Sequence, residues 1–257
     1  MKILTTIALF LGTMSSSYAI VKGQHVKYGT PIAQATVALH NSQTGTFCSG
    51  TLIDSHWVLT AAHCLSKEWK TLSGNVKPRD ISVIFGEFDA TNVSGITAGF
   101  VIKHPEFGEA ARVKYPDRND VALVRFDSKL PRGFVPVPLL SEEDYENMKP
   151  GTEVILAGFG MTSLRDHSTD KKLFSFATTY QSSDEEFRVA RLVPHEGKPG
   201  GNCPGDSGGP AFLNLEGKLY VFGVASTAEV SCEKFGEYGN IAHYKDWVTQ
   251  TIEQNTK

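Results

Sequence analysis

Three short segments of the sequence each set one reactive residue among small or apolar neighbours. WVLTAAHC ends an apolar run at His63, NDVALVRF begins another with Asp120, and NCPGDSGGP surrounds Ser207 with glycine and proline. A serine hydroxyl becomes a nucleophile when a base takes its proton, and a histidine base needs a carboxylate to orient it. Alone, such a histidine is more often structural, and such an aspartate is usually a turn residue. Together, the three segments predict an acyl-transfer site.

The composition of the chain bounds the kind of protein it forms. It has 257 residues, of which 40% are hydrophobic and 21% charged, with a net charge of −3. That length supports a core of its own, in one large all-β unit or two small domains. The mildly acidic net charge gives no sign of nucleic acid or an anionic membrane surface as a partner, and we expect neither.

Residues 1–19 have the pattern of a secretory signal peptide. Lys2 precedes the apolar run ILTTIALFLG, and the segment TMSSSYA that follows ends with small residues at Ser17 and Ala19. This order of charged start, short apolar middle and small-residue end is typical of a leader, and the run is too short to span a bilayer permanently. The alternative is a buried N-terminal strand. We expect a secreted protein, extracellular or periplasmic, that is no longer associated with a membrane once the leader is removed.

Four cysteines are present, and export to an oxidising compartment favours disulfides between them. Cys48, Cys64, Cys203 and Cys232 allow three pairings, between which sequence alone does not choose. Pairing near neighbours, Cys48 with Cys64 and Cys203 with Cys232, closes two short loops. The chain has no cysteine and histidine cluster of zinc spacing, so we expect no metal and no other cofactor.

Short runs rich in β-branched and aromatic residues, separated by Gly, Pro, Asn and Asp, predict an all-β fold. The runs are ATVAL, GTLID, HWVLTA, ISVIFGEF, DVALVRF, EVILAGFG and KLYVFGVAS. Helical periodicity appears in YKDWVTQTIEQNT, which predicts a terminal helix over about 244–256. The proline-rich segment LPRGFVPVPLLSEED indicates a connector between two halves, at about 20–135 and 136–243.

These motifs together resemble the trypsin-like serine proteases, the family with the chymotrypsin fold. TAAHC, NDVAL and GDSGGP match its three signature segments in the family's order of His, Asp and Ser. IVKG at 20–23 resembles the family's mature N-terminus, and CSGTLI, FGEFD, KHPEF, GFG, GVAS and the helix of Trp247 extend the likeness over most of the mature chain. The resemblance implies two Greek-key antiparallel β-barrels and a C-terminal α-helix, with the site in the cleft between the barrels.

The resemblance also implies a role for each matching residue. His63 would be the general base and then the general acid, Asp120 would orient it, and Ser207 would be the nucleophile. The backbone amides of Gly205 and Ser207 would form the oxyanion hole. Ser226 and the strand that follows it would pair with the substrate backbone.

A second acidic residue, Asp206, has a different implied role. In the family, the matching carboxylate forms a buried ion pair with the free amine of the mature first residue, here Ile20. A buried carboxylate without a partner is costly, so a new amine can order the oxyanion hole and the specificity pocket. Ile20 directly follows Ala19, the expected leader cleavage site. We therefore expect export itself to generate the active terminus, without a separate zymogen step.

The specificity pocket departs from the family members that cut after basic residues. Gly201 stands where they carry an aspartate, six positions before the nucleophile. Ala228 and Gly236 would form the walls, so the resemblance implies a preference for an uncharged P1 residue, aromatic or medium aliphatic. The loop that ends at Gly236 is short, which leaves open a closer position for Glu233 or Glu237.

Other departures leave the catalytic groups in place. Thr227 replaces the family's usual tryptophan, and Pro204 is atypical at the pocket rim. The calcium loop keeps Glu87 without a second acid, so we expect no tight calcium site. The sequon NVS at 92–94 is of a kind that is common and usually without consequence.

The leading hypothesis is a secreted, monomeric serine endopeptidase that acts on proteins or peptides and is open to a proteinaceous inhibitor. The alternative is a binding or adhesion protein on a protease fold, although such proteins usually have a replaced triad residue and none is replaced here. An α/β-hydrolase esterase would need the order Ser, Asp, His and helices between its strands. The order here is His, Asp, Ser, which excludes it.

Overall fold

The computed structural model describes residues 20–68, 73–88, 93–108, 119–161, 171–185 and 189–256. The expected signal peptide at 1–19 and Asn92 of the sequon lie outside these residues. Within the described ranges, no helix is long and apolar enough to span a membrane.

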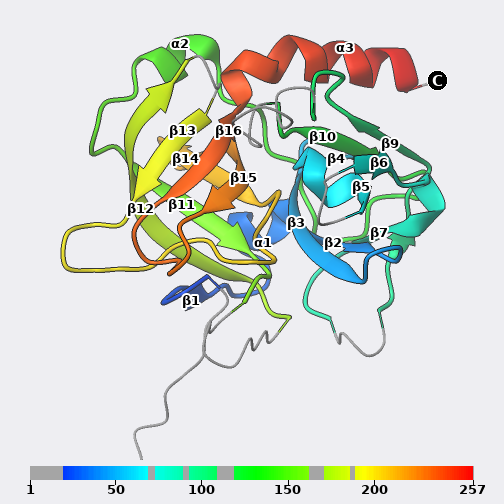
Figure 1. Ribbon diagram of the computed structural model, residues 1–257, viewed down its shortest axis with the longest axis horizontal. Coiled ribbons are helices and arrows are strands. Elements are labelled where there is room, and N and C mark those ends of the chain that lie inside the picture. Colours follow the sequence, from blue (N-terminus) through cyan, green and yellow to red (C-terminus); the bar gives the residue numbers. More distant parts are fainter. Residues whose placement is uncertain are drawn as a thin grey trace, which may run out of the picture.

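Two antiparallel seven-stranded sheets make up the body of the protein (Figure 1). The first has the order β8-β7-β2-β3-β4-β10-β9, and its strands are β2 (Thr36–Asn41), β3 (Thr46–Leu52), β4 (Trp57–Thr60), β7 (Ile81–Ile84), β8 (Ile96–Thr97), β9 (Phe100–Lys103) and β10 (Ala122–Arg125). The second has the order β1-β12-β11-β14-β15-β16-β13, and its strands are β1 (Gln24–His25), β11 (Glu153–Gly158), β12 (Phe174–Asp184), β13 (Val189–Val193), β14 (Pro210–Leu215), β15 (Lys218–Ala228) and β16 (Gly236–Asn240).

The two sheets differ in how far they close. A pairing of β12 with β13 closes six strands of the second sheet into a barrel, whereas the first sheet is curled. The all-β architecture expected from the sequence is confirmed. A small third sheet pairs β5 (Ser66–Glu68) with β6 (Ser73–Asn75).

Burial on both faces explains the apolar runs that predicted the strands. All four residues of β4 are buried, and so are the first three of β10, which pairs with it. A strand that is buried on both faces has a continuous run of apolar residues, whereas a strand with one exposed face alternates apolar and polar residues. Each fully buried Val or Leu side chain contributes about 1.5–3 kcal/mol relative to an exposed one. The centre of the first sheet is therefore a rigid support for the residues that flank it.

Each half of the chain receives a terminal segment of the other. Strand β1 pairs with β12, and the side chain of Ile20 lies in the core of the second barrel. Helix α3 (Lys245–Asn255) follows a 3₁₀ turn at Ile241–Tyr244, and its Val248 packs in the core of the first sheet. Figure 1 shows α3 starting between the two halves and running over the half that holds the first sheet. The terminal helix expected at about 244–256 is present.

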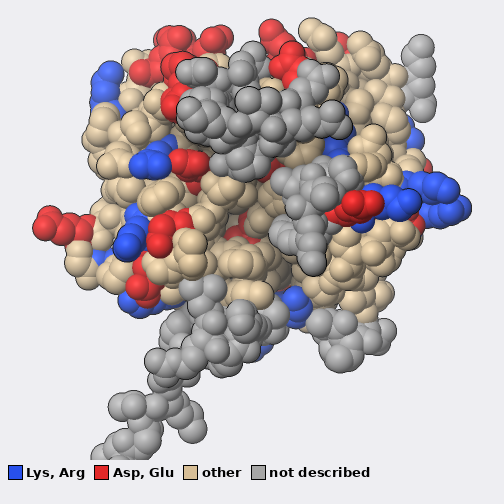
Figure 2. Space-filling view, viewed as in Figure 1, with Lys and Arg blue, Asp and Glu red and all other residues tan. Residues whose placement is uncertain are grey.

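Two short helices and two disulfides complete the described structure. The helices are α1 (Pro31–Ala35) and α2 (Glu142–Glu146), and Figure 2 shows acidic side chains gathered over α2. The disulfides are Cys48–Cys64 and Cys203–Cys232, which is the near-neighbour pairing. The first ties β3 to the turn that carries His63, and the second ties the segment before Ser207 to the loop after β15.

Candidate active site

Strand register brings His63 and Asp120 together. His63 lies in a 3₁₀ turn, Ala62–Leu65, that follows β4, and Asp120 lies just before β10. Strands β4 and β10 are antiparallel with Ala122 opposite Thr60, so the end of one lies beside the start of the other. Residues 57 positions apart in sequence therefore meet at one sheet edge.

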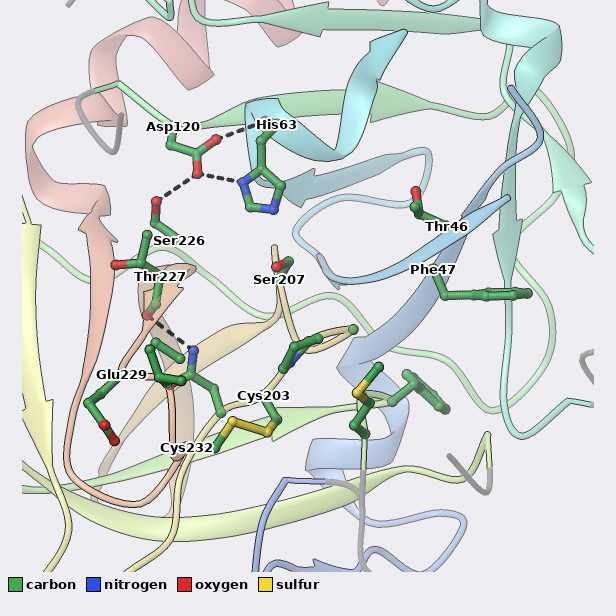
Figure 3. A pocket seen from close by; sticks show the side chains of 18 of the residues that line it. Thr46, Phe47, His63, Asp120, Cys203, Ser207, Ser226, Thr227, Glu229 and Cys232 are labelled. Atoms are coloured by element: carbon green, nitrogen blue, oxygen red, sulfur yellow. Dashed lines mark hydrogen bonds and ion pairs between the residues drawn. A yellow bond between two sulfur atoms is a disulfide. The ribbon is translucent and has the colours of Figure 1, made fainter. Parts of the chain in front are cut away.

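The Asp120 carboxylate is 2% exposed and contacts three donors (Figure 3). Its Oδ1 accepts from the backbone amide of His63 at 2.8 Å, and its Oδ2 lies 2.6 Å from His63 Nδ1. The hydroxyl of Ser226, on β15, donates to the same Oδ2 at 2.6 Å. Burial by itself would raise the pKa of Asp120, but the charge of His63 and the hydrogen bonds from His63 and Ser226 hold it below its ordinary value. The carboxylate is therefore kept ionised against the imidazole.

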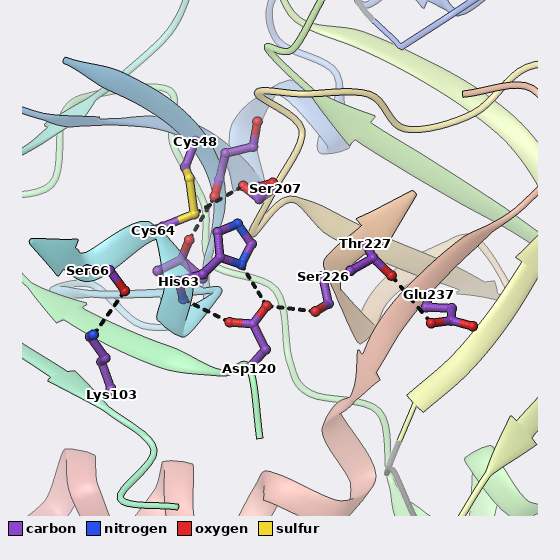
Figure 4. Close-up of polar contacts among 12 residues, drawn as sticks. Cys48, His63, Cys64, Ser66, Lys103, Asp120, Ser207, Ser226, Thr227 and Glu237 are labelled. Carbon is purple, nitrogen blue, oxygen red and sulfur yellow. Dashed lines mark hydrogen bonds and ion pairs between the residues drawn. A yellow bond between two sulfur atoms is a disulfide. The ribbon is translucent and has the colours of Figure 1, made fainter. Parts of the chain in front are cut away.

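Ser207 lies on the side of the His63 ring away from Asp120 (Figure 4). It sits in the turn before β14, and its carbonyl accepts from the Ser49 amide of β3 at 2.8 Å, which ties the turn to the first sheet. Gly208 has a φ of 77°, and a Cβ there would lie 2.1 Å from Thr60 Oγ1. This position therefore requires glycine for two reasons, conformation and space.

The backbone amides around Ser207 alternate between bonded and unbonded. Those of Asp206 and Gly208 donate to backbone carbonyls at 2.9 and 2.7 Å. Those of Gly205 and Ser207 have no acceptor among the residues that the structure describes. Gly205 has a φ of 98°, and a Cβ there would lie 2.7 Å from the Cα of Gly160. The amides of Gly205 and Ser207, two residues apart, are thus left available to donate to the oxygen of an external molecule.

Asp206 is buried and held by the backbone. Its two carboxylate oxygens accept from the amides of Gly160 and Cys203, each at 2.9 Å. Burial raises its pKa to about 7, although these two hydrogen bonds lower it. No contact of Asp206 with the amine of Ile20 is found within the described part of the chain, where residue 20 still follows residue 19. The neighbouring Val21 forms an antiparallel bridge with Gly201, with N–O distances of 3.1 and 3.3 Å.

A cavity of about 720 Å³ contains His63, Asp120 and Ser207 in its wall. Two of the four expected pocket residues, Ser226 and Ala228, line it, whereas Gly201 and Gly236 do not.

The side chain of Asn202 takes the place expected for the two glycines. It lines the cavity, its Nδ2 donates to the Thr227 carbonyl at 3.3 Å, and its Oδ1 would lie 2.1 Å from a Cβ at Gly236. The sequence analysis assigned Gly201 to the pocket and did not predict a role for Asn202. The position of Asn202 directly before Cys203, a disulfide cysteine close to Ser207, was the one sequence feature that pointed to the pocket.

The acids near the pocket are not those considered from the sequence. Glu233 pairs with Lys22 at 3.2 Å, and Glu237 pairs with Arg191 at 2.9 Å, and neither lines the cavity. Glu229 does line it, and its carboxylate accepts from the Ser231 hydroxyl. That hydrogen bond holds the pKa of Glu229 below its ordinary value.

Three further residues of the cavity wall were not predicted from the sequence. They are Phe47, Met161 and Lys171, and the Lys171 ammonium lies 4.0 Å from the centre of the Phe47 ring. These residues are far apart in the sequence, so no local sequence pattern connects them.

Metal-ligand groupings are sparse in the described residues. Among the described residues, one cluster of three such side chains is close enough to hold an ion, and it consists of Cys48, His63 and Cys64. The two cysteines of this cluster form a disulfide with each other. Glu87, the acid of the expected calcium loop, contacts His25.

The assembled groups suit proton transfer coupled to attack by a hydroxyl. An ionised carboxylate orients an imidazole, a serine lies on its other side, and two free amides flank that serine. This is the geometry of nucleophile, base, orienting acid and oxyanion donors that acyl transfer requires.

Comparison with known proteins agrees with the geometry. The trypsin family's sequence model matches residues 20–248. The chain is 29% identical over 229 residues to CLIP domain-containing serine protease B10 of Anopheles gambiae, covering 80% of this chain and 61% of that protein. It is 29% identical over 269 residues to human kallikrein-11, covering 98% and 87% of the two chains. It is 30% identical over 261 residues to human mannan-binding lectin serine protease 1, covering 89% and 35%.

The chain thus spans less than two thirds of the first and third of these relatives and most of the second. The family match itself extends over the greater part of the chain. The protein therefore belongs to the trypsin family of serine proteases.

Proposed function

We propose that this protein is a serine endopeptidase in which Ser207, His63 and Asp120 act as the catalytic triad. The observation that carries the proposal is the 2.6 Å contact between a buried, ionised Asp120 and Nδ1 of His63, with Ser207 on the far side of the ring. A carboxylate in this position fixes the imidazole tautomer that leaves the other nitrogen free to accept a proton.

Hydrolysis then proceeds in two steps, acylation of Ser207 and hydrolysis of the acyl-enzyme. Ser207 Oγ attacks the carbonyl carbon of the scissile bond while His63 takes the hydroxyl proton, and the amides of Gly205 and Ser207 donate to the oxyanion. His63 passes the proton to the leaving amine as the C–N bond breaks, which leaves an acyl-enzyme. A water molecule, deprotonated by His63, attacks the ester, and the proton returns to Ser207 as the acid product leaves.

Specificity is proposed to favour an uncharged P1 side chain. Asn202, Ala228 and the Cys203–Cys232 disulfide form the neutral part of the cavity wall. Apart from Asp120 of the proposed triad, the carboxylate among the described wall residues is that of Glu229, on the loop that follows β15. Burial of an apolar or aromatic side chain against this wall would supply the binding energy for cleavage.

Ile20 is proposed as the first residue of the active, secreted form, with its amine paired to Asp206. The buried carboxylate with its raised pKa supports this pairing, because a cation beside it would remove the cost of ionisation. The backbone of Ile20 supports it too. Its φ of 52° is rarely adopted by a β-branched residue, and this torsion exists only while residue 19 is attached. We propose that the secreted form acts as a monomer on protein or peptide substrates.

A cleavage-site profile on a mixed peptide library tests the function. The chain beginning at Ile20 is expected to cut after uncharged residues, and Ser207→Ala to abolish all cleavage. Labelling with a fluorophosphonate, which reacts with activated serines, should be lost in Ser207→Ala and retained in the matched control Ser231→Ala, whose serine lies outside the proposed machinery. A folded protein that neither cleaves nor labels would overturn the proposal, and cleavage after Lys or Arg would overturn the pocket assignment alone.

A further inference from the structure

The turn that carries His63 continues into a small hairpin, and the support of this hairpin bears on the proposed triad. Residues Ala62–Leu65 lead directly into β5, which pairs with β6. The amide of Val76, just after β6, donates to the Leu65 carbonyl at 3.2 Å and closes the hairpin onto the turn. A displacement of the hairpin would therefore move the backbone that carries the His63 side chain.

Side chains from two strands of the first sheet hold this hairpin. Asn41, on β2, donates through Nδ2 to the carbonyls of Cys64 and Ser66, both at 3.1 Å. Lys103, the last residue of β9, donates through Nζ to the Ser66 hydroxyl at 3.0 Å and to the Gly74 carbonyl at 2.9 Å. Figure 4 shows the contact between Lys103 and Ser66. Lys103 thus binds both strands of the hairpin, since Ser66 lies in β5 and Gly74 in β6.

Lys103 also lies beside the segment that carries Asp120. It stands opposite Ala122 on the paired strand β10, and Asp120 comes two positions before Ala122. The amide of His104 donates to the Val121 carbonyl at 2.9 Å, which fixes the end of β9 against the start of β10. One side chain therefore connects the hairpin with the strand pair next to Asp120.

The Lys103 side chain is partly buried, and its ammonium group has three N–H donors. Two of them reach the oxygens of Ser66 and Gly74, and the centre of the Phe107 ring lies 5.3 Å from Nζ, within the range of a cation–π contact. A hydrogen bond from a charged donor is roughly twice as strong as one from a neutral donor. Loss of the proton would therefore loosen the hold of Lys103 on the hairpin.

The surroundings of Lys103 determine the pH at which it loses this proton. Burial lowers its pKa to about 8, although the negative charge of Asp120 raises it. Further charged or titratable side chains on the elements packed against it, among the described residues, are His63 of the 3₁₀ turn, Lys67 and Glu68 of β5, Arg125 of β10, and His104 and Glu106 just after β9. Lys103 is therefore charged at neutral pH and becomes neutral in mildly alkaline solution.

We propose that Lys103 is a positioning residue for the proposed triad. Its ammonium holds the turn of His63 where Nδ1 meets the Asp120 carboxylate at 2.6 Å. Lys103 does not line the active-site cavity, so it acts on the base through the hairpin and not on the substrate. The inference rests on the proposed function, because that reaction needs an aligned base, and a misplacement of about 1 Å can lower a rate about 100-fold.

Steady-state kinetics of the full chain, collected in its secreted form, tests the proposal with a peptide taken from the cleavage-site profile. Active sites are counted by fluorophosphonate labelling, so that every rate is per active molecule. At neutral pH we expect Lys103→Met to lower kcat about 5- to 20-fold and to leave KM within about twofold. Lys103→Arg, which keeps the charge and the donors, should restore kcat to within about threefold.

A matched control and a second variant accompany these changes. Lys218→Met removes an ammonium that lies 5.1 Å from the centre of the Tyr220 ring on the second barrel, and it should change kcat and KM by less than about twofold. Ser66→Ala removes one of the two acceptors of Lys103 and should lower kcat about two- to fivefold. This variant keeps the proposal testable where Lys103→Met does not fold.

The dependence of kcat on pH separates positioning from a structural role. In the unaltered protein, kcat should fall with rising pH, with a midpoint near the Lys103 pKa of about 8. Lys103→Arg should lack this fall, because arginine stays charged. Lys103→Met should lack it too, at a uniformly low kcat. The proposed amine of Ile20 titrates in every variant alike, so any fall that it causes is common to all of them.

The fall should not arise from unfolding. Because the pKa of Lys103 is lower in the folded protein than in the unfolded chain, the unfolded chain binds more protons above about pH 8. Through this group, the free energy of unfolding therefore rises with pH in that range, while kcat falls. Urea unfolding at the same pH values checks that the two quantities change in opposite directions.

Proton NMR gives a readout that does not depend on turnover. The proton shared by His63 Nδ1 and Asp120 lies in a short hydrogen bond, so its signal is expected far downfield. The signal should broaden in Lys103→Met, because a misaligned imidazole exchanges this proton with water more rapidly. Lys103→Arg and Lys218→Met should retain it.

Three results would overturn the proposal. The first is an unchanged kcat and an unchanged downfield signal in both Lys103→Met and Ser66→Ala. The second is a loss of kcat in Lys103→Arg as large as that in Lys103→Met. The third is an alkaline fall of kcat that persists in Lys103→Arg with the same midpoint. A folded protein that neither cleaves nor labels would instead refute the proposed function, and the downfield signal would still report whether Lys103 aligns His63.

Discussion

Removal of residues 1–19 is expected to change how the stability of the protein depends on pH, through Asp206. In the chain that retains residues 1–19, burial raises the pKa of Asp206 from 3.8 to about 7, despite the hydrogen bonds that lower it. Because the folded-state pKa lies above the unfolded-state value, the folded form keeps a proton that the unfolded chain releases between these pH values. The free energy of unfolding therefore falls with rising pH, by about 1.4 kcal/mol per unit. The whole loss between pH 4 and 7 is about 4 kcal/mol.

A chain that begins at Ile20 should not show this loss. Its charged amine would pair with the ionised carboxylate, so the folded form would no longer need the proton. A second gain is independent of pH. The left-handed φ of 52° at Ile20 costs on the order of 1–3 kcal/mol, and this cost disappears when the bond to residue 19 is cut. The slope of the free energy of unfolding against pH thus reports the ion pair. The pH-independent difference in that free energy between the two forms reports the relieved strain.

Urea unfolding at several pH values between 4 and 8 separates these effects. Both forms would carry Ser207→Ala to prevent self-cleavage, and each would be compared with its Asp206→Asn variant. We expect the steep slope only in the longer form with Asp206 intact. Equal slopes in the two forms would refute the pairing of Ile20 with Asp206. A slope that Asp206→Asn leaves unchanged would refute the raised pKa.

Three further changes test the site and its supports. Ser226→Ala removes a hydrogen bond to the charged Asp120, and we expect kcat/KM to fall about 10- to 100-fold, since such bonds contribute about 1.5–3 kcal/mol; a change under twofold would contradict the positioning role. Gly201→Asp adds a carboxylate near the Cys232 carbonyl and should move the kcat/KM preference of paired peptides toward Lys and Arg; an unchanged preference would show that Asn202 screens the position. Replacing both Cys203 and Cys232 with serine opens a 29-residue link and should lower the free energy of unfolding in urea by about 3–4 kcal/mol; a loss under 1 kcal/mol would contradict this.

The sequence allowed the proposed triad to be named because each member lies in a distinctive local context. His63 follows a buried strand and Asp120 precedes one, and both strands are apolar enough to be recognised. The contact itself could not be predicted from these patterns. It depends on the register that sets Ala122 opposite Thr60, and register is a property of the whole sheet rather than of either strand.

Positions outside recognisable motifs were harder to predict. Asn202 fills space beside Gly236 only because two loops distant in sequence are held together by a disulfide. The segment EEDYE of α2 has the composition of a solvent-exposed helix start, and nothing in it shows that Tyr145 is buried. Both features arise from packing between distant elements, so they require coordinates.

Packing also explains why motifs far apart in the chain occur together. The Ser49 hydroxyl, from CSGTLI, accepts from the Phe159 amide of GFG and donates to the Gly205 carbonyl of GDSGGP, both at 3.0 Å. A Cβ at Gly158 would lie 2.2 Å from Asp206 Oδ1, so GFG also leaves the space that the buried carboxylate occupies. The three motifs are therefore parts of one packed unit around Asp206. A change in any of them would displace the proposed oxyanion donors without touching a triad residue, which is why the glycines belong to the site as much as the reactive side chains do.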